Sequence, residues 1–418
     1  MAQTTVISDR RQIYRPFLER LNPATPGVID AQRLIVPPDH DPRDPDQPPI
    51  HVAFANTAEL TRGAQVALVG GIGSGKTTEL QLTLKQLERH ADAVNIYVDL
   101  AEITDLNELN PGAILIAIGL GIYQELKKAD KETSQIKEAY EKLQELAGGK
   151  TEWVGPDDYE PDQEPDQEPD DGPEAVPVHV PGLLKPKFPA IQRTVADVRD
   201  LVFEIAMPLV EDTAQITVLI DGLDRLIRPE RFREFAEQDL RALRDTGISI
   251  IVAAPLLLWF DKSRFLQDYF DDVKHIPAAI SDPEQSDFLN QVLLRRGAAE
   301  LMGDREIAEL CRFSGGVMRD LITLARTSAE AAYRDDKDRV GTEHTASAIR
   351  QLGKRYLVGL GNAQRKIIRN LIENEEFSVE NSLSKQLLVN RQVLEYFSGQ
   401  RDFFAVHPAL AKMLTETA

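Results

Sequence analysis

Four glycines, a lysine and two threonines fall within the nine residues GGIGSGKTT (70–78). Gly70 is followed, after four residues, by Gly75, Lys76 and Thr77. In this arrangement successive backbone N–H groups can wrap a phosphate chain, and the next helix directs its positive dipole end at the same phosphates. We therefore expect a phosphate-binding loop made of Gly70, Gly71, Ile72, Gly73, Ser74, Gly75, Lys76, Thr77 and Thr78.

Two side chains of this loop have separate chemical roles. Lys76 would meet the β- and γ-phosphates of a nucleoside triphosphate as a point charge, and the Thr77 hydroxyl would ligate Mg²⁺. The alternative is a glycine-rich turn that binds nothing, but such a turn needs only one or two glycines. The sequence thus predicts ATP and Mg²⁺ as cofactors.

An apolar run that ends in aspartate supplies the second half of such a site. The segment ITVLIDGLDR (216–225) passes from a buried-strand pattern into Asp221. A carboxylate at a strand tip holds Mg²⁺ through water, while the threonine of the loop holds it directly. We give that role to Asp221, and Asp224 is the candidate that polarises the attacking water.

The elements that must position these residues alternate between strand and helix. Strands are expected at 66–69, 94–100, 216–221, 247–258 and 273–280, the last of them at an edge. Helices are expected after Lys76, where Leu80, Leu84 and Leu87 recur at helical spacing, and at 111–146 and 191–210. This alternation predicts an α/β fold, a parallel sheet with helices on both faces. Ligands then bind at the carboxyl ends of the strands, where Gly70 and Asp221 fall.

Beyond Ser281 the pattern becomes helical. Four helices are expected, at 283–296, 304–312, 317–333 and 343–356. As a lid beside the site, this region would bring Arg319, in the first turn of the third helix, near the γ-phosphate. A surface ion pair is the plainer alternative for this arginine.

The last sixty residues describe a winged helix. Helices at 364–372 and 382–388 precede two strands, 393–397 and 402–406, and a closing helix at 407–414. Residues 361–418 hold seven basic and seven acidic side chains. A balance of zero is a poor electrostatic footprint for DNA, so we expect this module to pack on protein.

The net charge of −20 is concentrated in one segment. Residues 152–174 contain eleven acidic side chains and no lysine or arginine, and removing those eleven charges leaves −9. Repeated Pro and Asp within 148–186 predict a disordered insertion, which is either a docking tail for a basic partner or a spacer. A mildly acidic remainder does not attract a duplex by bulk electrostatics.

Other features concern the compartment. The longest apolar run, 112–123, has twelve residues, whereas a membrane span needs about twenty. The first residues lack a secretory signal, and the single cysteine, Cys311, favours a reducing cytoplasm and a role in the core. We expect four parts: an extended arm at 1–62, the core at 63–280, the lid at 281–357 and the winged-helix module at 358–418.

The order of these motifs resembles the AAA+ and STAND P-loop ATPases, especially their origin-recognition-complex-like branch, over residues 60–418. Asp-Gly-Leu-Asp-Arg is also similar to KAP-type ATPases. The resemblance implies a Walker A at 70–77, a Walker B at Asp221 with an acid at Asp224, and a sensor-2 arginine at Arg319.

The chain departs from the pattern of these families in three places. Gly222 stands where many relatives carry glutamate, and 252–255 lack the polar residue of a sensor-1 strand. No arginine finger can be assigned, although Arg264 lies in the interval between the two strands in which one is expected. These departures predict slow hydrolysis.

The sequence therefore predicts an ATP hydrolase that acts as a nucleotide-dependent switch on a protein partner. Its use in bacterial signalling or anti-phage defence follows from the STAND resemblance alone. The alternatives are a DNA-associated ATPase of the replication-initiator or transposition-regulator type, and a scaffold that binds ATP without hydrolysis. AAA+ relatives build rings, so a nucleotide-dependent homo-oligomer is also open.

Overall fold

The computed structural model describes residues 2–21, 31–89, 93–103, 106, 110–147, 150–154, 176–180, 195–212, 215–226, 228–280, 287–398 and 400–416. The chain divides into two compact units. Unit 1 comprises Met1–Phe54, Ala67–Thr83 and Ala253–Ala418, and unit 2 comprises Ala55–Val66 and Leu84–Val252. The domain boundaries expected at 62, 280 and 357 stay predictions.

A five-stranded sheet has the order β2-β5-β6-β1-β7. Pairing is parallel between β2 and β5 and between β5 and β6. Every residue of β1 and β6 is buried, as in parallel strands covered on both faces. The predicted α/β class with a parallel sheet is confirmed, and β7 is an edge strand as expected. The strands are β1 (Gln65–Gly70), β2 (Ala93–Asp99), β5 (Gln215–Asp221), β6 (Ile248–Pro255) and β7 (Asp272–Ile276).

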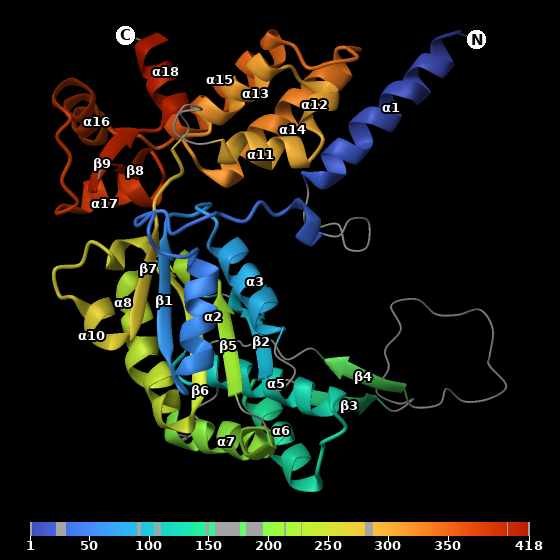
Figure 1. The fold of residues 1–418 in the computed structure, drawn as a ribbon, viewed down its shortest axis with the longest axis vertical. Helices are drawn as coiled ribbons and strands as arrows, with labels where there is room; N and C mark the ends of the chain where they lie inside the picture. The colour runs from blue at the N-terminus through green and yellow to red at the C-terminus, as the bar shows by residue number, and fades with distance from the viewer. Residues whose placement is uncertain are drawn as a thin grey trace. The chain divides into compact units, whose positions relative to one another are not determined.

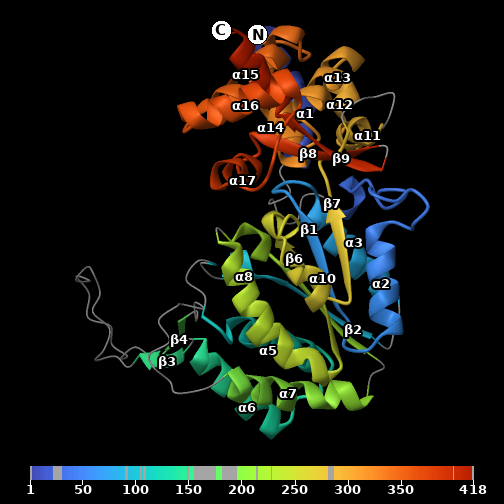
Figure 2. The same ribbon diagram turned by 90° about the vertical axis from the view of Figure 1, so that its left-hand side faces the viewer.

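In unit 2 three helices pack together, as both ribbon views show (Figures 1 and 2). They are α5 (Ala113–Lys128), α6 (Ser134–Leu146) and α7 (Val195–Asp212). A Cβ at Gly119 would lie 2.6 Å from Leu143 Cδ1 and 3.0 Å from Val202 Cγ2, so this glycine lets α5 approach both neighbours. The predicted helix at 111–146 is therefore two helices, which separate around Asp130 at a positive φ of 56°.

Shorter elements complete unit 2. The N-terminus of α5 is capped by Asp239 from a π-helical turn, through Gly112 N to Oδ1 at 2.7 Å and Ile114 N to Oδ2 at 3.0 Å. Within the predicted insertion, β3 and β4 pair antiparallel, while 155–175 and 181–186 lie outside the described residues. The elements are α4 (Leu100–Ile103), β3 (Lys150–Val154), β4 (Val176–Val180), the 3₁₀ turns Leu223–Arg225 and Arg244–Thr246, α8 (Pro229–Phe235), the π turn Ala236–Leu240 and α9 (Arg241–Leu243).

Unit 1 holds a helical region with its own core. Helices α11 to α15 gather beside α1 (Figure 1), and Tyr14, Phe17 and Leu21 of the N-terminal segment are buried in the same core. Cys311 is also buried there, as predicted. The elements are α1 (Ala2–Arg20), the 3₁₀ turns Ala31–Leu34 and Leu256–Leu258, α10 (Phe265–Tyr269), α11 (Phe288–Arg295), α12 (Ala298–Leu301), α13 (Asp304–Phe313), α14 (Met318–Arg334) and α15 (Thr342–Leu357).

The expectation of an extended arm over 1–62 misses most of two helices. The helical signal at 13–21 belongs to the longer α1, because its apolar face packs on α14. Residues Ile50–Leu60 form α2. Two helices, α2 and α3 (Lys76–Leu87), run from unit 1 into unit 2.

The C-terminal module consists of α16 (Asn362–Asn374), α17 (Ser382–Val389), the hairpin β8 (Val393–Ser398) and β9 (Arg401–Val406), and α18 (Pro408–Glu416). The hairpin pairs Val393 with Val406 and Ser398 with Arg401. Helices and a hairpin in this order match the elements expected from the sequence (Figure 1). Across the described parts of the chain, no helix is long and apolar enough to span a bilayer.

Candidate functional site

The loop between β1 and α3 has the backbone that a phosphate cradle needs. Gly73 and Gly75 take positive φ values of 84° and 109°, which L-residues rarely adopt. A Cβ at Gly70 would lie 2.6 Å from Ser74 Oγ and 2.9 Å from Ile276 O, so this position also excludes a side chain. Three of the four glycines are thus required by the conformation or the packing of the loop.

Lys76 is folded back along this loop. The residue is 4% exposed, and its Nζ donates to the carbonyl oxygens of Gly70 and Gly71, both at 2.8 Å. Ser74 Oγ is buried and has no hydrogen-bond partner among the described residues. A buried ammonium, an orphaned hydroxyl and a glycine-lined backbone together fit a phosphate chain.

The first turn of α3 begins at Lys76 and includes Thr77 and Thr78. The first N–H groups of a helix have no preceding carbonyl within the helix and favour an anion. Thr77 is exposed, and Thr78 and Ile72 are half-buried. All nine residues of the predicted loop therefore belong to one strand–loop–helix turn.

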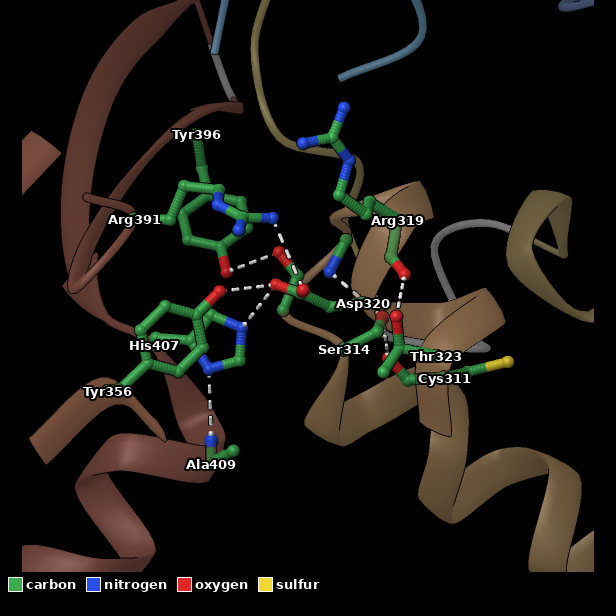
Figure 3. Close-up of polar contacts among 12 residues, drawn as sticks. Cys311, Ser314, Arg319, Asp320, Thr323, Tyr356, Arg391, Tyr396, His407 and Ala409 are labelled. Atoms are coloured by element: carbon green, nitrogen blue, oxygen red, sulfur yellow. Dashed lines mark hydrogen bonds and ion pairs between the residues drawn. The ribbon is translucent and has the colours of Figure 1, made fainter. Parts of the chain in front are cut away.

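The predicted lid arginine lies against the same loop. Met318 N, at the start of α14, donates to Gly73 O at 3.0 Å. A Cβ at Gly73 would be 3.0 Å from both Val317 Cγ1 and Arg319 Cβ, so only glycine allows this approach. Arg319 is exposed, and its side chain extends away from that of Asp320 (Figure 3).

The turn that precedes α14 is held just as closely. Gly316 has a φ of 77°, and a Cβ there would collide with Ala279 O at 1.8 Å. Ala279 N donates to Gly316 O at 3.3 Å, and Tyr396 OH donates to Gly315 O at 2.9 Å. The start of α14 is therefore fixed by the segment after β7 and by the hairpin.

Asp320 joins α14 to the C-terminal module (Figure 3). Its carboxylate is 5% exposed, accepts a hydrogen bond from Tyr356 OH and lies 3.2 Å from Arg391 Nη1 and 3.4 Å from His407 Nε2. Because His407 Nδ1 accepts from Ala409 N at 3.2 Å, the ring carries its proton on Nε2, toward Asp320.

Electrostatics at Asp320 favour its charged form. Burial raises the pKa of this carboxyl, but the hydrogen bond from His407, the charge of Arg391 and the Tyr356 hydroxyl outweigh burial and hold the pKa below its usual value. The pKa of Tyr356 is raised, first by burial and then by the charge of Asp320. The aspartate next to Arg319 is thus a permanent anion at neutral pH.

A small cavity separates the phosphate-binding loop from the hairpin. Its volume is about 30 Å³. Ile72 and Ser74 of the loop line it together with Val317, Arg391 and Leu394. Residues of the loop, of the start of α14 and of the C-terminal module therefore face one another across a space of atomic size.

The proline-rich tract attaches through Arg43. Its guanidinium donates from Nη1 to His275 Nδ1 at 2.9 Å and lies 2.7 Å from Asp402 Oδ1. It also stacks over Trp259 and Phe397, with 5.1 and 4.5 Å between the guanidinium carbon and the ring centroids. Through Arg43 the tract therefore contacts both β7 and the hairpin. No local sequence pattern indicated this role for Arg43.

In unit 2, Asp221 ends β5 and is 1% exposed. Its Oδ2 accepts from Tyr97 OH at 2.8 Å and its Oδ1 accepts from Gly222 N at 2.7 Å. Asp224 lies half-buried in the following 3₁₀ turn. The register of the sheet sets Asp221 opposite Asp99 at the end of β2.

Gly222, the residue after Asp221, packs closely against Asp99 and Ala101. Its φ is 95°, and a Cβ there would lie 2.9 Å from both Asp99 Oδ1 and Ala101 N. Asp99 is half-buried, and its Oδ1 accepts from Ala101 N at 3.0 Å. In the sequence Asp99 lies at the end of an expected strand, where an acid is more often a solvated loop residue than a ligand, and its place opposite Asp221 depends on which strand lies next to β5.

Comparison with known proteins gives structural likeness only. No family model matches the sequence, and no curated protein matches it. The fold is similar to the Orc1 protein of Aeropyrum pernix in complex with DNA, with 15% identity, 96% of each chain covered and a TM-score of 0.45. It is also similar to Cdc6p from Pyrobaculum aerophilum (13% identity, 96% of this chain, 98% of that chain, TM-score 0.43). The RuvB Holliday junction branch migration motor of Thermotoga maritima is similar at 14% identity (87% of this chain, 92% of that chain, TM-score 0.40).

Proposed function

We propose that this chain is an AAA+ type P-loop ATPase whose nucleotide state sets the position of its C-terminal module. The observation that carries the proposal is the hydrogen bond from Met318 N to Gly73 O. It ties the start of α14 to the centre of the phosphate-binding loop. A change of loop conformation then moves α14, because the carbonyl at 73 and the amide at 318 move together.

The site residues take the roles that their chemistry allows. Lys76 binds the β- and γ-phosphates, and Thr77 and Asp221 hold Mg²⁺, which neutralises the charge that develops on the phosphates. Arg319 reaches the γ-phosphate, and the sequence points to Asp224 for the attacking water. The hydrogen bonds from Lys76 Nζ to the carbonyl oxygens of Gly70 and Gly71 use the same ammonium protons that a phosphate would accept. Nucleotide binding therefore loosens the turn at Gly70 and Gly71 and reshapes the loop.

The coupling continues from α14 into the C-terminal module. Asp320 follows Arg319 directly; its charge is matched by Arg391 of that module, and His407 Nε2 of the same module lies 3.4 Å from its carboxylate. The γ-phosphate is present in the ATP state and absent in the ADP state. Its contacts are strong enough to shift an element such as α14 between two positions. We propose that ATP and ADP give different positions of the hairpin, and that this difference regulates a partner.

A protein is the first candidate for that partner. Arg391, one of the two cations at the expected recognition helix, is committed to Asp320, which leaves Lys385 exposed there. DNA is the second candidate, because α16 and the hairpin expose Arg365, Lys366, Arg369 and Arg401. Duplex affinity that falls steeply with salt would favour DNA, and no binding at about 50 mM salt with ATP present would remove it.

Hydrogen exchange with ATP against ADP tests the switch. We expect the amides of 391–407 to differ in protection between the two nucleotides in the wild type, and not in Lys76→Ala. Lys85→Ala is the matched control, since Lys85 is an exposed lysine on the same helix. If protection is equal in all samples, and nucleotide binding is shown independently, the switch is contradicted. The protein would then be a scaffold that binds ATP.

A further inference from the structure

The glutamate that follows the strand aspartate in many relatives is absent here, and the structure supplies a physical reason. At φ 95° Gly222 takes a conformation that side chains rarely adopt. A Cβ would also come within 2.9 Å of Asp99 Oδ1 and of Ala101 N. Glutamate is therefore excluded at 222 twice, by backbone conformation and by space.

The space that a side chain at 222 would enter already contains a carboxylate. It belongs to Asp99, which the register of β2 and β5 brings opposite Asp221. Its Oδ1 is oriented by the backbone N–H of Ala101 at 3.0 Å. The chain thus delivers an acidic group from the neighbouring strand instead of from the residue after Asp221.

Asp221 itself is unsuited to polarise water. It is almost fully buried, and both of its oxygens accept hydrogen bonds, one from Tyr97 and one from Gly222. Asp99 is half-buried and lies at the end of a parallel strand, the edge at which ligands of such sheets bind. It therefore combines a fixed orientation with access to solvent.

We propose that Asp99 is the residue that orients and deprotonates the attacking water. This inference rests on the proposed ATPase function. The Asp99 carboxylate accepts a proton from water as the water oxygen bonds to the γ-phosphorus. The bond from that phosphorus to the bridging oxygen breaks with its electron pair, and ADP leaves with the phosphate released. The residue acts on the reacting water and is a catalytic residue in that sense.

The test separates hydrolysis from binding. Asp99→Asn keeps the size of the side chain and an oxygen for the Ala101 N–H. We expect it to lower the rate of phosphate release by about 10²- to 10⁴-fold. Affinity for a fluorescent ATP analogue should change by less than about threefold, because only transition-state stabilisation is removed. Asp200→Asn, at an exposed carboxylate of α7 in unit 2, is the matched control and should keep hydrolysis within about fivefold of the wild type.

Each remaining outcome has a definite meaning. Loss of hydrolysis in Asp224→Asn with normal hydrolysis in Asp99→Asn overturns the inference and leaves the ATPase function standing. A wild type that binds ATP and releases no phosphate also overturns the inference. A wild type that binds no ATP contradicts the proposed function itself.

Discussion

Arg391 and Asp320 stand 71 residues apart in the chain, yet Arg391 Nη1 lies 3.2 Å from Asp320 Oδ1. Tyr356 and His407 face the same carboxylate, so side chains from α15, from the turn before β8 and from the residue before α18 converge on the first turn of α14. The side chain next to Arg319 is therefore an anchor for the C-terminal module. Asp320 thus directly follows Arg319, the residue proposed to contact the nucleotide.

Replacing this anchor should destabilise the protein. In Asp320→Asn the buried His407 and the partly buried Arg391 lose their anion, and we expect the free energy of unfolding to fall by about 3 kcal/mol. Urea unfolding measures the change, and the exposed Asp338→Asn should alter it by less than about 0.5 kcal/mol. Equal effects of the two substitutions would show that Asp320 is not an anchor.

Asp239 makes stability depend on pH in an unusual direction. Burial raises its pKa to about 7, against backbone hydrogen bonds from Gly112, Ile114 and Leu115 that lower it. The folded protein then holds a proton that the unfolded chain releases near pH 4. Stability is greatest below that pH as far as this group is concerned and falls as pH rises through 7, by about 4 kcal/mol in total.

The Asp239→Asn variant checks this assignment. It lacks the titrating proton, so the slope of unfolding free energy between pH 4 and 7 should become flatter than in the wild type. Because its amide group cannot accept from Ile114 N, stability at pH 5 should also fall by about 1–3 kcal/mol. An unchanged slope would assign the pH dependence to other groups.

Alanine substitutions at Gly73 and Gly75 can distinguish the cost of backbone strain from the cost of losing the close contact with the start of α14. Both have positive φ, but a Cβ at Gly75 meets nothing within 4 Å, whereas one at Gly73 meets Val317 and Arg319. Gly75→Ala should cost only the strain, about 1–2 kcal/mol. Gly73→Ala should cost more and also release the Met318 amide to hydrogen exchange. Equal protection of that amide in both variants would contradict the proposed contact of loop and lid.

Arg43 should hold the proline-rich tract in place through its planar guanidinium. In Arg43→Ala the carboxylates of Glu395 and Asp402 lose their cation, and we expect about 2–4 kcal/mol of destabilisation. Arg43→Lys should recover little, because an ammonium cannot stack on Trp259 and serve two acceptors at once. Urea unfolding measures the free energy of unfolding of both variants, with Arg11→Ala, at an exposed arginine, as the control. Full recovery of stability in Arg43→Lys would argue against stacking.

The sequence predicted what local periodicity encodes. Helices expected at 304–312, 317–333 and 343–356 appear within two residues of those bounds, since each repeats its apolar residues at helical spacing. It missed α2, whose apolar residues follow a proline-rich tract. The loop at 70–78 was identifiable because all its functional groups are adjacent in sequence. Asp99 and Asp320 were not, because their partners are brought near them only by strand order and helix packing.

Gly222 gives the sharpest test of the site in unit 2. Gly222→Ala introduces a Cβ 2.9 Å from Asp99 Oδ1, so the carboxylate must move. We expect phosphate release to fall at least about tenfold while ATP affinity is kept, because an aspartate displaced by about 1 Å no longer orients water.

Gly247→Ala is the control for backbone strain. Gly247 also lies in unit 2 with a positive φ of 76°, but a Cβ there meets nothing within 4 Å. Both substitutions carry the strain of a positive φ, about 1–2 kcal/mol, so both should lower the melting temperature. Only the substitution at 222 should slow hydrolysis, because only that one reaches Asp99. If Gly247→Ala slowed hydrolysis equally, the loss in Gly222→Ala would reflect general destabilisation, which would contradict a specific effect of the Gly222 substitution on Asp99.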